Sequence, residues 1–144
     1  MNNLFTSIII YTIIGTVTLS AQTIFGKWKT FDDETGNEKS IVEIYQKDGK
    51  IYGKVWQVLE KGKENKVCGE CKGDKKNKPI KGMVIIEGLK KDANEYSGGT
   101  ILDPKNGKEY KCYIALDGAN KLKVRGFTGF ALIGRTQYWQ RVTE

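Results

Sequence analysis

The sequence predicts an all-β protein, an up-and-down antiparallel β-barrel of about eight strands. Three observations support this fold class. Short segments rich in β-branched and aromatic residues follow one another along most of the chain. Turn-forming sequences separate several of these segments. No segment has a convincing helical period, and the only candidate exception is the glycine-bounded stretch 127–134.

The first 21 residues predict a signal peptide. They contain no Lys, Arg, Asp or Glu, and residues 4–19 are mostly apolar. This apolar core suits a secretory signal and is shorter than the ~20 residues that a membrane-spanning helix needs. Small residues before Gln22 place the cleavage after Ala21, but a basic n-region is missing, so an uncleaved anchor is the alternative. We expect an exported protein, periplasmic or secreted, with a single domain over residues 22–144.

Eight segments of the mature chain predict strands. They are, in order, the ranges 26–31, 39–46, 50–58, 82–88, 98–103, 108–116, 121–127 and 135–142. Turn signals such as "KDGK", "DPKNGK" and "DGANK" join neighbouring strands. Apolar residues lie on one side of these strands, so the sheet must close or stack to hide its edges. Hairpin-length links favour an up-and-down barrel, with a Greek-key sandwich as the alternative.

One link is much longer than the others. Residues 60–81 form a lysine-rich loop, and residues 61–81 alone hold eight lysines against three acidic residues. The simplest interpretation is a solvated segment. The functional alternative is peripheral contact with an anionic membrane surface or an acidic partner. We do not expect nucleic acid as a partner, because no aromatic residue lies among these lysines.

This loop also carries two cysteines, Cys68 and Cys71, in the sequence "CGEC". In an exported protein this spacing predicts a local disulfide of modest stabilising effect, because the ring that it closes is short. A zinc site needs four ligands, and Cys112 adds only a third thiol. A redox dithiol lacks the usual helix N-terminus, although the nearby lysines keep that alternative open. Cys112 lies on an apolar strand face and is expected to be a buried free thiol.

The composition argues against catalysis. The chain contains no histidine, which excludes Ser-His and Cys-His pairs and histidine-ligated metals. No glycine-rich phosphate loop follows a strand and opens a helix. The adjacent carboxylates Asp32 and Asp33 lie in the turn-like stretch "DDETGN". We therefore expect a protein that is not an enzyme and that has no metal and no cofactor.

Several stretches resemble known families. "FGKWKT" is similar to the Gly-x-Trp signature of lipocalins and other calycin barrels. Further stretches resemble the bacterial family called domain of unknown function 2147, and they are "GKW", "DGKIYGKV", "CGECKGDKKNKPIKGM", "GGTILDPKNGKEYKC" and "VRGFTGFALIGRTQYWQRV". Together they cover nearly all of the mature chain. The resemblance implies an exported small domain with a calycin-like barrel, and it implies no known activity.

The resemblance also implies a contact that closes the barrel. Calycins place an arginine across the tryptophan of this signature, and in an even-numbered meander the end of the last strand meets the start of the first. The role then falls to Trp28 and Arg141, with Arg135 as second choice. Arginine suits it because a planar cation can stack and donate hydrogen bonds at once. The alternative is that Trp28 is ordinary core and Arg141 ordinary surface.

Two main classes of function stay open, because a fold does not decide between them. In one, the barrel binds a small apolar or anionic, lipid-like ligand. In the other, its own side chains fill the barrel and the surface loops bind a partner. An envelope thiol-disulfide protein is a third alternative. In the binding hypothesis the apolar wall comes from the strand faces that contain Val55, Ile85, Tyr110, Ile114, Leu122 and Val124.

The polar anchor depends on which face of the last strand points inward. If Arg135 shares the inner face with Arg141, it lies ~20 Å along the strand and holds a carboxylate or phosphate at the opposite mouth. If the other face points inward, Arg135 is an ordinary surface cation. Residues 126–134, with aromatic and leucine side chains between glycines, are either a flexible lid or a packed plug.

Overall fold

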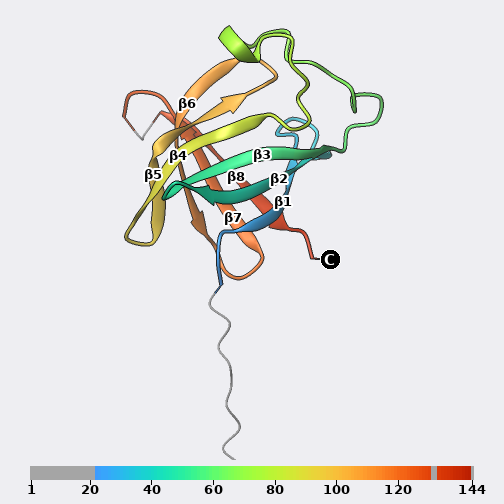
Figure 1. Ribbon diagram of the computed structural model, residues 1–144. Helices are drawn as coiled ribbons and strands as arrows, with labels where there is room; N and C mark the ends of the chain where they lie inside the picture. The colour runs from blue at the N-terminus through green and yellow to red at the C-terminus, as the bar shows by residue number, and fades with distance from the viewer. Residues whose placement is uncertain (1–21, 131–132, 144) are drawn as a thin grey trace, which may run out of the picture.

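The computed structural model describes residues 22–130 and 133–143, and it forms a closed barrel of eight antiparallel strands (Figure 1). This is the predicted all-β, up-and-down fold. The predicted signal peptide, residues 1–21, lies outside the described residues, and so do positions 131–132 of the predicted lid or plug. Among the described residues, no helix is long and apolar enough to span a membrane.

The strands follow one another around the barrel in sequence order. They are β1 (Gly26–Phe31), β2 (Glu38–Lys47), β3 (Lys50–Val58), β4 (Val84–Asp92), β5 (Glu95–Asp103), β6 (Lys108–Leu116), β7 (Lys121–Phe127) and β8 (Gly134–Arg141). A single 3-10 turn, η1 (Gly73–Lys75), lies in the long link between β3 and β4. Pairing of Trp28 with Arg141 and of Lys29 with Gln140 joins β8 to β1 and closes the barrel.

The fourth and fifth strands are longer than the predicted ranges 82–88 and 98–103. β4 continues to Asp92 and β5 begins at Glu95, and a tight turn at Ala93 (φ 53°) joins them. The prediction stopped early because residues 89–97 are mostly polar. Their outward side chains are exposed, and only Leu89 and Tyr96 mark the inner face.

Antiparallel pairing sorts the links between strands to two ends. The closed end carries the short turns 48–49, 93–94 and 117–120. The open end carries the links 32–37, 59–83, 104–107 and 128–133. Figure 1 shows the long link between β3 and β4 at the top and the start of β1 at the opposite end.

Several of the largest buried side chains of the core lie toward the closed end. They include Trp28, Ile44, Leu89, Ile114 and Leu122. Cys112 is a buried free thiol, and burial raises its pKa to about 12. It is therefore a small apolar side chain at neutral pH.

Candidate functional site

The closed end of the barrel is sealed by one cation on one aromatic ring. The guanidinium carbon of Arg141 lies 4.3 Å from the centre of the Trp28 ring. Its Nε donates to the carbonyl of Ala119 at 2.9 Å, and its Nη1 and Nη2 donate to the carbonyls of Phe25 and Thr23 at 3.1 and 2.5 Å. One side chain thus ties the N-terminal segment and the β6–β7 turn beneath a fully buried indole.

Above this floor the barrel contains a cavity of about 410 Å³ that opens between the links of the open end. Apolar side chains from β3 to β8 and from the β3–β4 link make up most of its wall. They are Val55, Val58, Ile80, Ile85, Ile101, Tyr110, Val124 and Trp139. Charged and hydroxyl groups gather at the rim, so the cavity has an apolar interior and a polar entrance.

Most of the residues predicted to line a ligand site do line this cavity. They are Val55, Ile85, Tyr110, Val124 and Arg135. Ile114 and Leu122 do not, and here the structure corrects the predicted wall. Both side chains are 0% exposed in the packed layer at the closed end. Both residues lie on parts of β6 and β7 that extend below the cavity. Alternation in the sequence predicts which face of a strand a side chain lies on, but not how far along the barrel axis it lies.

The inner face of β8 is the one that carries Arg135, Gln137, Trp139 and Arg141. Trp139 is buried, whereas its neighbour Tyr138 is 50% exposed on the outside of the barrel. The first three residues of this face line the cavity, and Arg141 lies under the floor. Arg135 therefore lies at the open mouth, at the far end of the strand from Arg141.

The guanidinium of Arg135 contacts carboxylates of the chain itself. Its Nε lies 2.8 Å from Oδ2 of Asp33, and its Nη2 lies 3.6 Å from Oδ2 of Asp103. Gln137 donates to the same Asp33 carboxylate at 3.0 Å and accepts a 3.1 Å hydrogen bond from the Trp139 indole. This network ties the β1–β2 link to β5 and β8. Arg135 thus orders the mouth and has few donors left for a ligand.

The rim also carries four lysines, two with a carboxylate partner and two without one. Lys63 pairs with Glu60 at 3.2 Å, and Lys105 pairs with Glu34 at 3.4 Å. Lys39 and Lys66 also line the cavity, and within the described ranges they form no ion pair. Unpaired positive charge at the entrance of an apolar cavity favours the head group of an anion.

Asp32 adds a fixed negative charge to the lining of the cavity. Hydrogen bonds from Thr35, first from its backbone N–H and then from its hydroxyl, lower the pKa of Asp32. The two distances to Asp32 Oδ1 are 2.9 and 3.1 Å. Asp32 therefore stays ionised at neutral pH. The rim is mixed in sign, and it is not a uniformly cationic ring.

The lysine-rich loop, residues 60–81, contains a small folded hairpin and is not only a solvated segment. The Cys68–Cys71 disulfide that the sequence predicted is present, and both cysteines are almost fully buried. Backbone hydrogen bonds of 2.8 Å join Cys68 N–H to the Lys78 carbonyl and Asn77 N–H to the Cys68 carbonyl. A bridge between Val67 and Pro79 completes this small hairpin.

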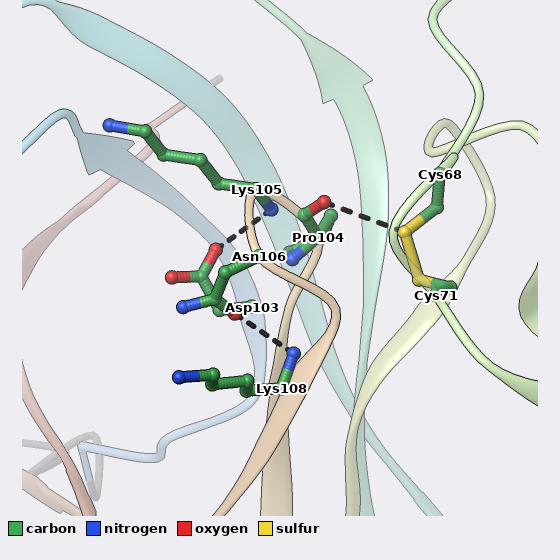
Figure 2. Close-up of a disulfide and its surroundings, with 7 residues drawn as sticks. All are labelled: Cys68, Cys71, Asp103, Pro104, Lys105, Asn106 and Lys108. Carbon is green, nitrogen blue, oxygen red and sulfur yellow. Dashed lines mark hydrogen bonds between the residues drawn. A yellow bond between two sulfur atoms is a disulfide. The ribbon is translucent and has the colours of Figure 1, made fainter.

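The hairpin packs against the turn between β5 and β6 (Figure 2). The Sγ of Cys68 lies 3.5 Å from the Pro104 carbonyl oxygen, a close contact and not a hydrogen bond, because a disulfide sulfur has no hydrogen. Gly107 of this turn has φ +70° and lies directly against the backbone of the hairpin. Any Cβ at this position would collide with the Glu70 carbonyl. The side chain of Asp103 accepts from Lys105 N–H at 2.9 Å and holds the turn. This docking keeps the loop at the wall of the cavity.

Several residues of this mouth did not stand out in the sequence. Lys39 and Lys66 are two lysines among many. Asp33 and Asp103 belong to ordinary turn sequences, and each meets Arg135 only through the closure of the barrel. The one local signal was the glycine of "PKNGK", because a close backbone approach often requires glycine.

Within the described part of the chain, no group of three or more His, Cys, Asp and Glu side chains is placed to hold a metal ion. Arg135, Lys63 and Lys105 pair with carboxylates of the mouth, whereas Lys39 and Lys66 stay unpaired within the described ranges. Their geometry suits recognition of a head group by charge and hydrogen bonding.

Comparisons with known proteins agree with this architecture. A family model described as an uncharacterized protein conserved in bacteria (DUF2147) matches residues 26–141. A solved structure described as protein HP1028 from the human pathogen Helicobacter pylori, of the lipocalin family, is similar with a TM-score of 0.75. The two chains are 22% identical, and the match covers 85% of each, a likeness that shows the fold. No curated protein matches this chain.

Proposed function

Because this chain belongs to the DUF2147 family of uncharacterized bacterial proteins, we propose a function from its own cavity: it binds a small amphipathic ligand inside the barrel. The observation that carries the proposal is the open cavity of about 410 Å³, with an apolar wall and a charged rim. Small-molecule sites typically measure about 300–1,000 Å³ and combine apolar walls with a few polar groups.

The ligand places its apolar part against the wall that Val55, Ile85 and Val124 form. Burial of apolar surface supplies the main driving force, at about 25 cal/mol per Å². Its polar head lies at the rim. The unpaired lysines Lys39 and Lys66 make a carboxylate or phosphate the best head group.

Arg135 supports this site by positioning its mouth. Its contacts with Asp33 and Asp103 hold three elements at the entrance. A ligand anion that contacts Arg135 must compete with these two carboxylates. The lysines have no such competitor and are the more favourable anchors.

The cavity supports binding over a barrel that its own side chains fill. Burial of both cysteines supports a structural disulfide over a thiol-disulfide exchange centre, because exchange needs an accessible sulfur. A disulfide also fits an oxidising compartment, which supports the proposal that the protein acts outside the cytoplasm.

The test combines native mass spectrometry with titration of dodecanoate and dodecanol, which share a tail and differ in charge. We expect both to bind, and dodecanoate to bind more tightly. Val124→Phe enlarges a side chain of the cavity wall, whereas Lys123→Phe places the same ring on the outer face of β7. Only the first variant should lose binding. The double variant Lys39→Gln/Lys66→Gln should weaken dodecanoate binding by about threefold to tenfold and spare dodecanol.

The outcomes separate the parts of the proposal. If neither compound binds and the protein extracted from its own envelope carries no ligand, the binding function is wrong. If both bind equally and the lysine variant changes nothing, the cavity binds apolar tails without selecting an anion. Thermal melts of all variants exclude loss of folding as the cause.

A further inference from the structure

We infer that the open end of the barrel is a docking surface for an anionic lipid bilayer. The surface consists of Phe130 and Ile133 in the β7–β8 link and of the unpaired lysines of residues 61–81. We call it the docking face. Two of these residues, Lys66 and Ile133, also line the cavity, whereas Phe130 and the other unpaired lysines lie outside it. The inference therefore does not require a ligand in the cavity.

Phe130 and Ile133 are the apolar part of the docking face. They are 84% and 66% exposed, more than any other large hydrophobic side chain in the described part of the chain. The turn that presents them is hydrogen-bonded, with 3.0 Å bonds from Thr128 N–H to the Ile133 carbonyl and from Ile133 N–H to the Phe130 carbonyl. Large apolar side chains that are exposed together mark an interaction site.

The lysines of the loop are the cationic part. Six of the eight lysines in residues 61–81 are exposed and form no ion pair within the described residues. They are Lys61, Lys66, Lys72, Lys76, Lys78 and Lys81. The acidic side chains of the β1–β2 link, in contrast, are largely paired, as in Asp33 with Arg135 and Glu34 with Lys105. Residues 61–81 hold only three acidic residues against eight lysines, so this segment has a net charge of +5.

The closed end has less of both parts. Its turns combine five lysines with four acidic residues, and they are Lys47, Lys50, Lys90, Lys91, Lys121, Asp48, Asp92, Glu95 and Asp117. None of the most exposed hydrophobic side chains lies in these turns. The open end thus carries both the most exposed apolar side chains and the lysine-rich segment 61–81.

A bilayer fits this face better than an acidic protein does. The apolar tip and the lysine hairpin come from different links of the open end (Figure 1), and both links contribute side chains to the lining of the cavity. A planar, deformable surface can touch both at once. An anionic bilayer can also bind both parts of the face, because apolar side chains insert between lipids and lysines attract anionic head groups. Each interaction is weak, and the two add together.

The experiment is flotation of the exported protein, in its natural processed form, with phosphatidylcholine vesicles and with vesicles that contain about one third phosphatidylglycerol. We expect binding to the anionic vesicles only, weakened by salt. Lys72→Gln/Lys76→Gln/Lys78→Gln should reduce partitioning on the order of 100-fold. The matched control, Lys47→Gln/Lys50→Gln/Lys91→Gln, removes the same charge from the closed end and should change it little.

The apolar part has its own pair of variants. Phe130→Ser should reduce partitioning by about tenfold or more, whereas Tyr138→Ser, on the outer face of β8, should not. A polarity-sensitive dye on Phe130→Cys should shift to the blue with anionic vesicles, and the same dye on Lys91→Cys should not. Labelling is selective because Cys68 and Cys71 are bonded and Cys112 is buried.

Three results would overturn the inference. One is the absence of binding to anionic vesicles. Another is an equal loss of binding in the two lysine triples, which would show attraction to net charge alone. The last is a dye response at position 91 and none at position 130, which would place the closed end on the lipid. All compared variants share one N-terminus, so a retained leader cannot produce these differences.

Discussion

Arginine at position 141 shows how a single side chain decides the geometry of one end of the molecule. It stacks on Trp28 and donates to three backbone carbonyls from two separate segments. The other two arginines also bridge neighbouring strands or links, Arg125 to Thr136 at 2.9 Å and Arg135 to Asp33. All three lie in the last twenty residues of the sequence. Arginine is used here where a planar fork must satisfy several acceptors.

The first prediction concerns this residue pair. Trp28→Ala should lower the free energy of unfolding by about 3–5 kcal/mol, because the buried indole fills the floor. Arg141→Lys should lower it by about 1–3 kcal/mol, since lysine keeps the charge and cannot reach three carbonyls and the ring together. Urea unfolding followed by circular dichroism measures both. Arg125→Lys is the control, and an Arg141→Lys variant as stable as the wild type would contradict the assignment.

At the scale of elements, the lysine-rich loop acts as a folded hairpin that another turn supports. A four-residue disulfide ring stabilises by only about 2 kcal/mol through chain entropy. The disulfide matters more for the position of the hairpin than for this entropic stabilisation. Burial of both cysteines and the contact between Glu70 and Gly107 hold the hairpin on the β5–β6 turn. The lysines of the mouth and of the docking face therefore depend on a turn that is distant in sequence.

The second prediction tests that contact. Gly107→Ala should cost at least ~2 kcal/mol more than Gly118→Ala. Both glycines have positive φ, at 70° and 78°, so backbone strain is similar, but only a Cβ at 107 would collide with another segment. Chemical unfolding gives the stabilities, and dodecanoate titration should show weaker binding for Gly107→Ala alone. Equal costs for the two variants would show that the hairpin does not rest on this turn.

At the scale of the whole molecule, the two ends of the barrel differ in every property that bears on function. The closed end has short turns, a packed floor and nearly balanced charge. The open end has long links, a cavity, exposed apolar side chains and unpaired lysines. Antiparallel pairing of an even number of strands produces this division, because it sends alternate links to the same end. Binding and docking are therefore both proposed for one end.

The third prediction concerns the form in which this molecule acts. Protein isolated from the envelope should begin at Gln22, because small residues precede that position and a short uncharged apolar core precedes them. Intact-mass measurement distinguishes this form from the full chain. A mass that still includes residues 1–21 would indicate an anchored protein, and the vesicle experiments would then compare anchored variants.

Much of the barrel was predictable from local sequence. Alternation of apolar and polar residues marks a strand and its inner face, and turn sequences mark its ends. These signals located all eight strands and failed only where β4 and β5 expose a polar stretch around Ala93. The Cys68–Cys71 disulfide was predictable for the same reason, since three residues of separation keep the partners together.

The mouth of the cavity required the tertiary structure. Asp33 and Arg135 are far apart in the chain, and only barrel closure brings their side chains to 2.8 Å. That contact changes Arg135 from a free anchor into a residue that positions other groups, and it leaves Lys39 and Lys66 as the unpaired cations. Strand alternation likewise placed Ile114 on an inner face but not below the cavity. Local periodicity specifies direction, whereas pairing of charges, depth and empty volume depend on distances between segments that the chain alone does not bring together.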